Sequence, residues 1–142
     1  MGTDDNKMLV RRQFDEIWNG ANWETVDELF ASDYLNHDPY NPNQEKGPEG
    51  FKQRVAGYRS VLDGFDLRVE RQIAEGDFVE TLWSLRGTHA GPLEGAEPTG
   101  KAVRIEGQLL SRIVDGKFVE EWVNWDTVGL LRQIGAVSPP PA

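Results

Sequence analysis

Hydrophobic and polar positions follow two different periods along this chain, and the change between them falls near residue 64. Before it, apolar residues recur at helical spacing in three segments. After it, apolar and polar residues alternate, which is typical of strands that bury one face. The pattern therefore predicts helices segregated from a run of strands, the arrangement of an α+β domain.

The first half is expected to hold three helices and one short strand. The first helix covers residues 5–20, where Asn19-Gly20 supplies a left-handed cap. Asn22 is a favourable N-cap for a second helix that buries Val26 and Leu29. Residues 34–37 are predicted to form a strand, and Pro48 to open a third helix that ends near residue 62.

The second half is predicted to form two antiparallel hairpins and a closing helix. The strands cover residues 65–73, 78–88, 101–114 and 117–125, and the helix covers 127–135. Residues 90–100 are rich in Gly and Pro and link the hairpins, so we expect a rim or lid there. Residues 136–142 are predicted to be a disordered tail of this single domain. Such a curved sheet, wrapped over helices, would enclose a conical pocket.

The Asp115-Gly116 turn sets the register of the last hairpin, because this pair tolerates the positive φ angles of a type I′ turn. Counting outward predicts five opposed pairs: Ile113 with Phe118, Ser111 with Glu120, Leu109 with Trp122, Gly107 with Asn124, and Ile105 with Asp126. This register points Trp122, Asn124 and Asp126 toward the core and leaves Val119, Val123 and Trp125 outside. A β-bulge in this stretch would reverse the assignment.

Length, charge and cysteine content limit the size of the domain, its binding partners and its location in the cell. The chain has 142 residues, enough for one domain with a substantial core. Its formal net charge of −9 argues against nucleic acid or an anionic membrane as a partner, since both would need a positively charged surface. It has no cysteine, and its N-terminal stretch has no apolar segment typical of a signal peptide, so we expect a cytoplasmic protein.

Asp126 is the first candidate for chemistry. A carboxylate on a mostly apolar face has a raised pKa and could remove a proton from carbon near neutral pH. Alternatively, Asp126 is the N-cap of the closing helix, since it directly precedes that helix and Asp is favoured there. The sequence leaves both roles open, and they are compatible. Glu120 and Glu121 are expected to be solvated or to pair across strands.

The two histidines and several aromatic residues are further candidates. His37 could shuttle a proton or could only stabilise its own turn, and His89 could lie at the pocket mouth or simply end a strand. The predicted substrate-binding residues are His89, Trp83, Trp122, Asn124, Tyr58, Phe51 and Tyr34, although aromatic residues on a core face are more often only part of the core. Two lone histidines without cysteine give no metal-ligand pattern, and the sequence has no phosphate-binding glycine loop, so neither metal nor cofactor is expected.

Five segments in order resemble the SnoaL-like polyketide cyclases, also called ester cyclases, of the nuclear transport factor 2-like superfamily. They are N-H-D-P (36–39), G-P-E-G-F-K (47–52), L-R-G-T-H-A-G (85–91), P-T-G-K (98–101) and the stretch 115–135. The resemblance implies an α+β conical barrel, a homodimer, and a cofactor-independent intramolecular aldol condensation on an aromatic polyketide ester. It also implies Asp126 as general acid/base and His37 facing the pocket.

Three functions follow as hypotheses. The first is such a cyclase, acting on a small hydrophobic or aromatic substrate, with Asp126 as base and His37 or His89 polarising the enolate oxygen. The second is a small-molecule-binding dimer module without catalysis. The third is an epoxide-hydrolase-like enzyme, which needs an Asp-Arg-Asp cluster, but the predicted register puts Arg104 and Arg112 on the face opposite Asp126.

Overall fold

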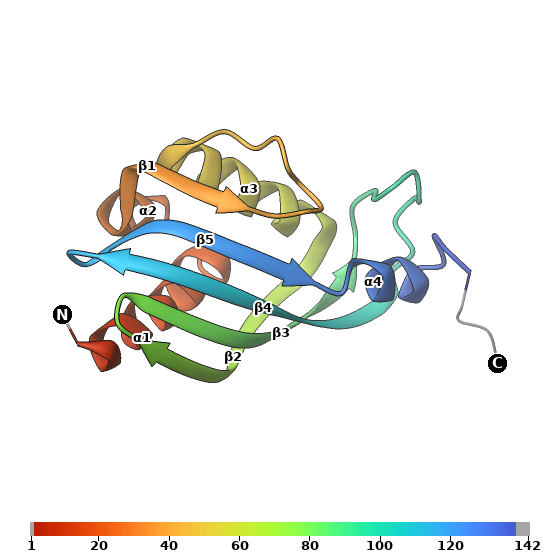
Figure 1. The fold of residues 1–142 in the computed structure, drawn as a ribbon. Helices are drawn as coiled ribbons and strands as arrows, with labels where there is room; N and C mark the ends of the chain where they lie inside the picture. The colour runs from red at the N-terminus through yellow and green to blue at the C-terminus, as the bar shows by residue number, and fades with distance from the viewer. Residues whose placement is uncertain (1, 139–142) are drawn as a thin grey trace.

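Residues 2–138 are described by the computed structural model, which has an α+β architecture (Figure 1). The helical segments are α1 (Thr3–Arg12), the π-helical η1 (Gln13–Trp18), α2 (Trp23–Leu29), α3 (Gly47–Val61) and α4 (Thr127–Gln133). The strands are β1 (Phe30–His37), β2 (Leu62–Glu75), β3 (Phe78–His89), β4 (Ala102–Val114) and β5 (Lys117–Trp125). The predicted element order and the α+β class are confirmed. The predicted tail lies partly outside the described residues.

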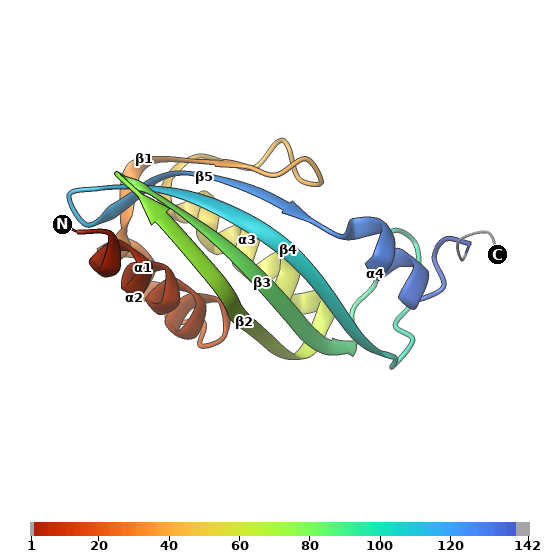
Figure 2. The same cartoon turned by 60° about the horizontal axis from the view of Figure 1, so that its bottom comes forward.

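The strands form one mixed sheet in the order β1-β5-β4-β3-β2, with β1 parallel to β5 and the other pairs antiparallel. The sheet curves over α1, α2 and α3, which lie on its concave side (Figure 2). β1 and β2 are its edges, so the sheet is open, whereas a barrel would close on itself. Within residues 2–138, no helix combines the length and hydrophobicity needed to cross a bilayer.

The core fills the space between the concave face and the helices. Phe30 stacks on Phe51 with ring centroids 4.1 Å apart and also contacts Phe118 at 4.9 Å. These three rings come from β1, α3 and β5, so their burial joins elements that are distant in sequence. Burial of such apolar side chains is the main force that holds the helices on the sheet.

The predicted first helix changes its hydrogen-bond pattern midway. From Gln13 the helix widens to i→i+5 bonding, as in the bond from Asn19 N–H to the Phe14 carbonyl at 2.9 Å. A widened turn shifts the side chains that follow it, and such turns are frequent at functional sites. Here the segment presents Gln13, Phe14 and Trp18 to the interior, although its apolar spacing alone predicts an ordinary helix.

The predicted register of the last hairpin is correct next to the turn but wrong farther along the strands. Ile113 pairs with Phe118 as expected, but Arg112 pairs with Glu120, so Val119 is an extra residue in β5. Ser111 therefore opposes Glu121, Leu109 opposes Val123, and Gly107 opposes Trp125. This β-bulge reverses every later side chain of the strand, because side chains alternate between the two faces.

Because of the bulge, the predicted orientation is wrong for six residues, from Glu121 to Asp126, including Trp122, which stacks on His37 and does not line the interior cavity. Glu121 and Val123 are buried, and Trp125 points toward the helices. Asn124 and Asp126 are exposed, so their predicted inward orientation is wrong. The Asp126 carboxylate instead accepts a hydrogen bond from Gly129 N–H at 2.9 Å and is the N-cap of α4.

Gly107 provides a test of the packing under the sheet. A Cβ atom there would lie 2.2 Å from Cζ2 of Trp83. We expect Gly107→Ala to lower the free energy of unfolding by about 1–3 kcal/mol, because the rigid indole must move. Gly57→Ala is the control, since its Cβ would meet nothing within 4 Å and alanine favours a helix by up to about 1 kcal/mol. Urea denaturation measures both; equal changes would contradict this packing.

Candidate active site

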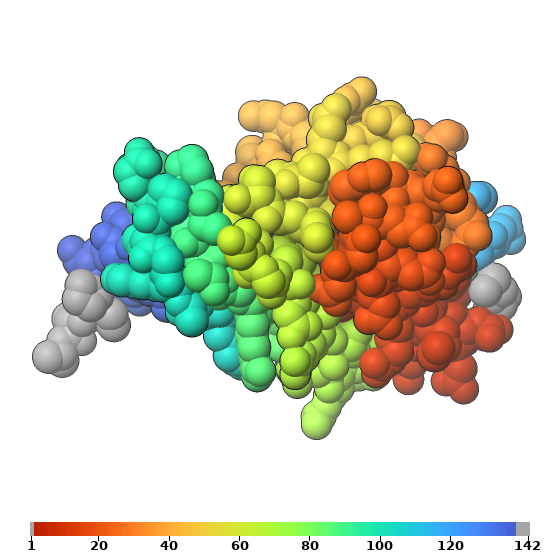
Figure 3. Space-filling model, turned by 180° about the vertical axis from the view of Figure 1, so that it is seen from behind, coloured from red at the N-terminus to blue at the C-terminus, as the bar shows by residue number. Residues whose placement is uncertain are grey.

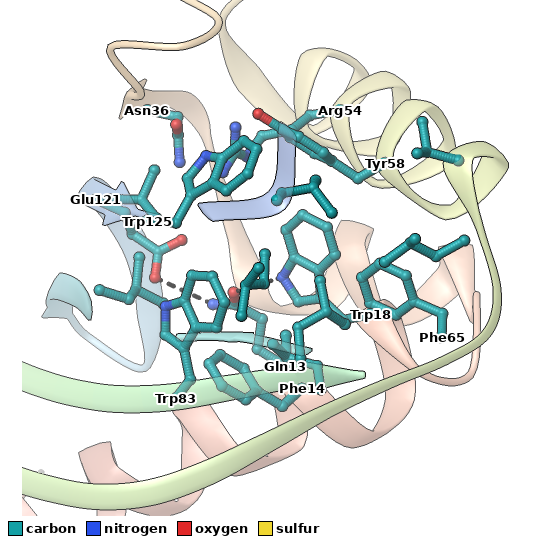
Figure 4. A pocket seen from close by; sticks show the side chains of 18 of the residues that line it. Gln13, Phe14, Trp18, Asn36, Arg54, Tyr58, Phe65, Trp83, Glu121 and Trp125 are labelled. Atoms are coloured by element: carbon teal, nitrogen blue, oxygen red, sulfur yellow. Dashed lines mark hydrogen bonds between the residues drawn. The ribbon is translucent and has the colours of Figure 1, made fainter. Parts of the chain in front are cut away.

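A mostly apolar cavity lies between the concave face of the sheet and the helices η1 and α3 (Figure 4). The cavity leaves about 70 Å³ of room for the centres of water-sized spheres, and the space is about 740 Å³ when the open solvent at its mouth is included. Its apolar walls are formed by Phe14, Trp18, Phe51, Val61, Leu62, Phe65, Leu67, Trp83, Leu85, Leu93, Ile105, Leu109, Val123, Trp125 and Leu130. Such walls, with a few placed polar groups, are typical of small-molecule sites.

Five polar residues also line the cavity: Gln13, Asn36, Arg54, Tyr58 and Glu121. They come from η1, β1, α3 and β5, so only the folded chain brings them together. They form two groups, one centred on Glu121 and the other on the ion pair of Arg54 with Asp38.

Glu121 is completely buried and accepts three hydrogen bonds. Its Oε1 accepts from the Tyr34 hydroxyl at 2.7 Å, and its Oε2 accepts from Gln13 Nε2 at 3.1 Å and from Ser111 Oγ at 2.5 Å. Gln13 Oε1 in turn accepts from Trp18 Nε1 at 3.2 Å. Donors from three other elements therefore fix the orientation of this carboxyl group.

Burial raises the pKa of Glu121 above its ordinary value, and the three hydrogen bonds and the charge of Arg54 oppose that rise without cancelling it. Burial also raises the pKa of Tyr34 well above its usual value, with Glu121 adding to the effect, so Tyr34 remains a hydroxyl donor. A carboxyl group with a raised pKa inside an apolar cavity is suited to proton transfer at carbon.

The second polar group joins Asp38, Arg54 and Tyr58. Arg54 Nη1 and the Tyr58 hydroxyl both donate to Asp38 Oδ2, the latter at 2.6 Å. Burial acts to raise the pKa of Asp38, but the charge of Arg54 and hydrogen bonds from Tyr58, Arg54 and the Tyr40 N–H together hold that pKa below its usual value. Asp38 therefore stays ionised and neutralises Arg54.

Some residues predicted as substrate-binding meet at this cavity. Phe51, Tyr58 and Trp83 line it, and Tyr34 lies behind Glu121 as its donor. Trp122 does not line it; its indole stacks on the His37 ring at 5.3 Å, and His37 Nε2 lies 2.6 Å from Glu120 Oε2. His37, Trp122, Asn124 and Asp126 are thus not among the lining residues.

His89 ends β3 and holds the loop that follows. Its Nδ1 accepts a hydrogen bond from Thr99 N–H at 3.1 Å and lies 2.9 Å from Thr99 Oγ1. The same loop is bonded to the end of α3, where Ala90 N–H donates to the Val61 carbonyl at 2.9 Å, and it lies against α3 in Figure 3. Leu93 of this loop reaches the cavity, so the loop supplies part of its wall.

Three cavity residues were not predicted from the sequence: Glu121, Arg54 and Gln13. Of the two roles expected for Glu121, solvation is wrong because the bulge turns its side chain inward, whereas pairing across strands is present in its hydrogen bond with Ser111. The sequence does contain an indication that Gln13 and Arg54 are buried. Each is a polar residue within the apolar stripe of a helix, next to Phe14 and Val55 respectively. A polar residue within an apolar stripe must have a partner inside the fold.

Glu121 makes the stability of the protein depend on pH. Because its native pKa is raised, the folded state binds more protons than the unfolded state above about pH 4.3, and stability falls as pH rises through the native pKa. We expect Glu121→Gln to remove this fall, so its stability relative to the parent should increase with pH. Urea denaturation between pH 4 and 8 measures the difference. A constant difference would contradict the raised pKa.

Comparison with known proteins identifies the family. A model of the SnoaL-like polyketide cyclases matches residues 8–134. The chain is 35% identical to nogalonic acid methyl ester cyclase of Streptomyces nogalater over 83% of this chain and 89% of the relative. It is 34% identical to aklanonic acid methyl ester cyclase DnrD of Streptomyces peucetius, over 94% of this chain and 92% of the relative.

Solved structures share the fold. TsrD from Streptomyces laurentii superimposes with a TM-score of 0.86 at 23% identity, covering 96% of this chain and 99% of TsrD. A SnoaL-like polyketide cyclase from Agrobacterium tumefaciens superimposes with a TM-score of 0.77 at 13% identity, covering 95% of this chain and all of the other. With the family match and the two named cyclases, the predicted enzyme class is confirmed, and this chain belongs to the SnoaL-like polyketide cyclase family.

Proposed function

We propose that this chain catalyses a cofactor-independent, intramolecular aldol-type ring closure on a flat, mainly apolar substrate. Glu121 takes the acid–base role that the sequence analysis gave to Asp126. The observation that carries this proposal is the buried Glu121 carboxyl group, with its raised pKa, in the wall of a mostly apolar cavity. The relatives named as methyl ester cyclases support the reaction class, and the substrate of this chain is proposed only as a class.

Proton transfer by Glu121 accounts for both halves of the reaction. Its ionised form removes a proton from the carbon next to a carbonyl, giving an enolate and a protonated Glu121. The enolate carbon then bonds to a second carbonyl carbon of the same molecule, whose oxygen becomes an alkoxide. Glu121 returns its proton to that oxygen, so the group is regenerated. A pKa raised toward neutrality favours a group that must act in both directions.

The surroundings of Glu121 suit this role. Oε1 accepts a hydrogen bond from Tyr34 alone among the described residues, so one of its lone pairs remains for a substrate proton. Tyr34, Gln13 and Ser111 hold the carboxyl group in one orientation. Trp83 and Trp125 offer flat apolar faces in the cavity wall, which favour a planar substrate.

Deuterium exchange at the α-carbon tests the proposal. We expect the protein to catalyse uptake from heavy water into β-keto esters or aromatic diketones, and Glu121→Gln to lower the rate by about 100-fold or more, because the base is lost. Asp126→Asn is the matched control: it removes a carboxylate, but asparagine also caps helices, so its exchange rate should equal the parent's.

The outcomes separate the candidate functions. Loss of exchange in Asp126→Asn with normal exchange in Glu121→Gln would return the catalytic role to Asp126. Binding of these compounds without exchange in the parent protein would favour the non-catalytic binding module. Circular dichroism of both variants must match the parent, so that lost exchange reports lost chemistry.

We also propose a homodimer formed through the outer face of the sheet. Phe78 and Leu82 of β3 are 40% and 36% exposed, and Phe78 lies 6.4 Å from Trp122 on the neighbouring surface. Apolar side chains gathered on one sheet face favour association with a second protein surface. Of the outer-face set predicted from the sequence, Val123 and Trp125 are excluded because the bulge turns both toward the cavity.

Sedimentation velocity tests the dimer. We expect the parent protein to sediment as a dimer and Leu82→Lys to sediment as a monomer, because a desolvated ammonium group would oppose the interface. Val128→Lys is the control, since Val128 is 51% exposed on α4 and lies outside the sheet. A monomeric parent, or a dimer in Leu82→Lys, would contradict this interface.

A further inference from the structure

Two polar atoms in residues that line the cavity are buried and have no hydrogen-bond partner among the described residues. They are Nε of Arg54, a donor, and Oδ1 of Asn36, an acceptor. A buried donor or acceptor without a partner costs about 1–3 kcal/mol, so such atoms call for an explanation. Both residues are labelled in Figure 4, near the indole of Trp125.

The contacts of Arg54 fix its guanidinium group but leave its Nε–H without an acceptor in the part of the chain that the structure describes. Its side chain is only 5% exposed, and Asp38 binds it through Nη1. Its guanidinium carbon lies 4.9 Å from the centre of the Tyr58 ring and 5.6 Å from that of Trp18, which fixes the plane of the group. With Nη1 engaged and the plane fixed, Nε–H cannot turn to Asp38 without breaking this arrangement.

The hydrogen bonds of Tyr34 determine which end of the Asn36 amide is free. The single hydroxyl proton of Tyr34 goes to Glu121, so its oxygen must accept from Asn36 Nδ2, which lies 2.9 Å away. Oδ1 of Asn36 is therefore the free acceptor. Asn36, Arg54 and Glu121 all line the same cavity, so the free donor and the free acceptor belong to its wall together with the proposed acid–base group (Figure 4).

We propose that Arg54 and Asn36 together determine substrate specificity by binding a hydroxy-ketone or keto–enol group. The carbonyl oxygen would accept from Arg54 Nε–H, and the hydroxyl would donate to Asn36 Oδ1. This inference rests on the proposed ring-closure function, to which it adds the polar recognition of the substrate. When the α-proton leaves, the carbonyl oxygen gains negative charge, and the fixed guanidinium group would stabilise that charge.

Binding of three naphthalenes, followed by tryptophan fluorescence, tests this pair. The probes are 1-hydroxy-2-acetonaphthone, its 1-methoxy analogue, which lacks the hydroxyl proton, and 2-ethylnaphthalene, which lacks the carbonyl. We expect Arg54→Lys to weaken the binding of both ketones by about 10-fold or more relative to the binding of 2-ethylnaphthalene. Lysine keeps the charge but has no Nε–H donor. Arg68→Lys is the control, because Arg68 is exposed and pairs with Asp66.

Asn36→Ala tests the acceptor. We expect it to abolish the preference of the parent for the hydroxy ketone over the methoxy ketone, with little change for 2-ethylnaphthalene. Equal weakening of all three probes in Arg54→Lys would overturn the inference, because it would mean that Arg54 only shapes the cavity. An unchanged preference in Asn36→Ala would also overturn it.

The binding and exchange experiments test the recognition pair and the catalytic role of Glu121 separately. If ketone selectivity depends on Arg54 but deuterium exchange does not depend on Glu121, the recognition pair stands and the proposed catalytic role fails. If exchange depends on Glu121 but ketone selectivity is unchanged in Arg54→Lys, the catalytic role stands and the recognition pair fails.

Discussion

Val119 is an extra residue in β5, and the face of every side chain that follows it in the strand depends on this bulge. Without it, Glu121, Val123 and Trp125 would point to the outer face. Trp122, Asn124 and Asp126 would take their places in the interior, so the cavity would have a different carboxyl group and a different indole. One residue of register therefore decides where the polar chemistry of this protein lies.

The buried position of Glu121 depends on a second local irregularity. The π-helical turn of η1 presents Gln13 to Glu121 and Trp18 to Gln13. The hydrogen bond between Gln13 and Glu121 therefore joins an irregular helix to the bulged strand β5. A buried acid without these donors would be costly. With them, the orientation of the acid is fixed, and its pKa stays raised because burial outweighs the opposing effect of the donors.

Charge in the cavity is divided between two groups. Asp38 neutralises Arg54, whereas Glu121 is held by neutral donors and needs no counter-ion. The remaining walls are apolar and contribute three tryptophans, Trp18, Trp83 and Trp125. This division fits a substrate that is mostly flat and hydrophobic with a few oxygen atoms at one end. The unpartnered Arg54 and Asn36 atoms lie among these polar groups.

The sequence by itself determined the elements, their order and the family. Helical spacing before residue 64 and alternation after it predicted the α+β class, and Asp115-Gly116 predicted the turn, in which both residues have positive φ. These are local properties, since periodicity and turn chemistry act between neighbours in the chain. The sequence left two roles open for Asp126, general base and N-cap of the closing helix. The structure shows the N-cap role, which is also a local property of the chain.

Tertiary structure alone decided which residues share the cavity. A bulge leaves no mark on an alternating pattern as short as Phe118 to Trp125, so the register beyond Val119 was unpredictable, and with it the burial of Glu121. Arg54 and Asp38 are 16 residues apart, and Glu121 and Gln13 are 108 apart. Only the packing of α3 and η1 under the sheet brings these pairs into contact, because long-range hydrogen bonds follow from the whole fold and from no single segment.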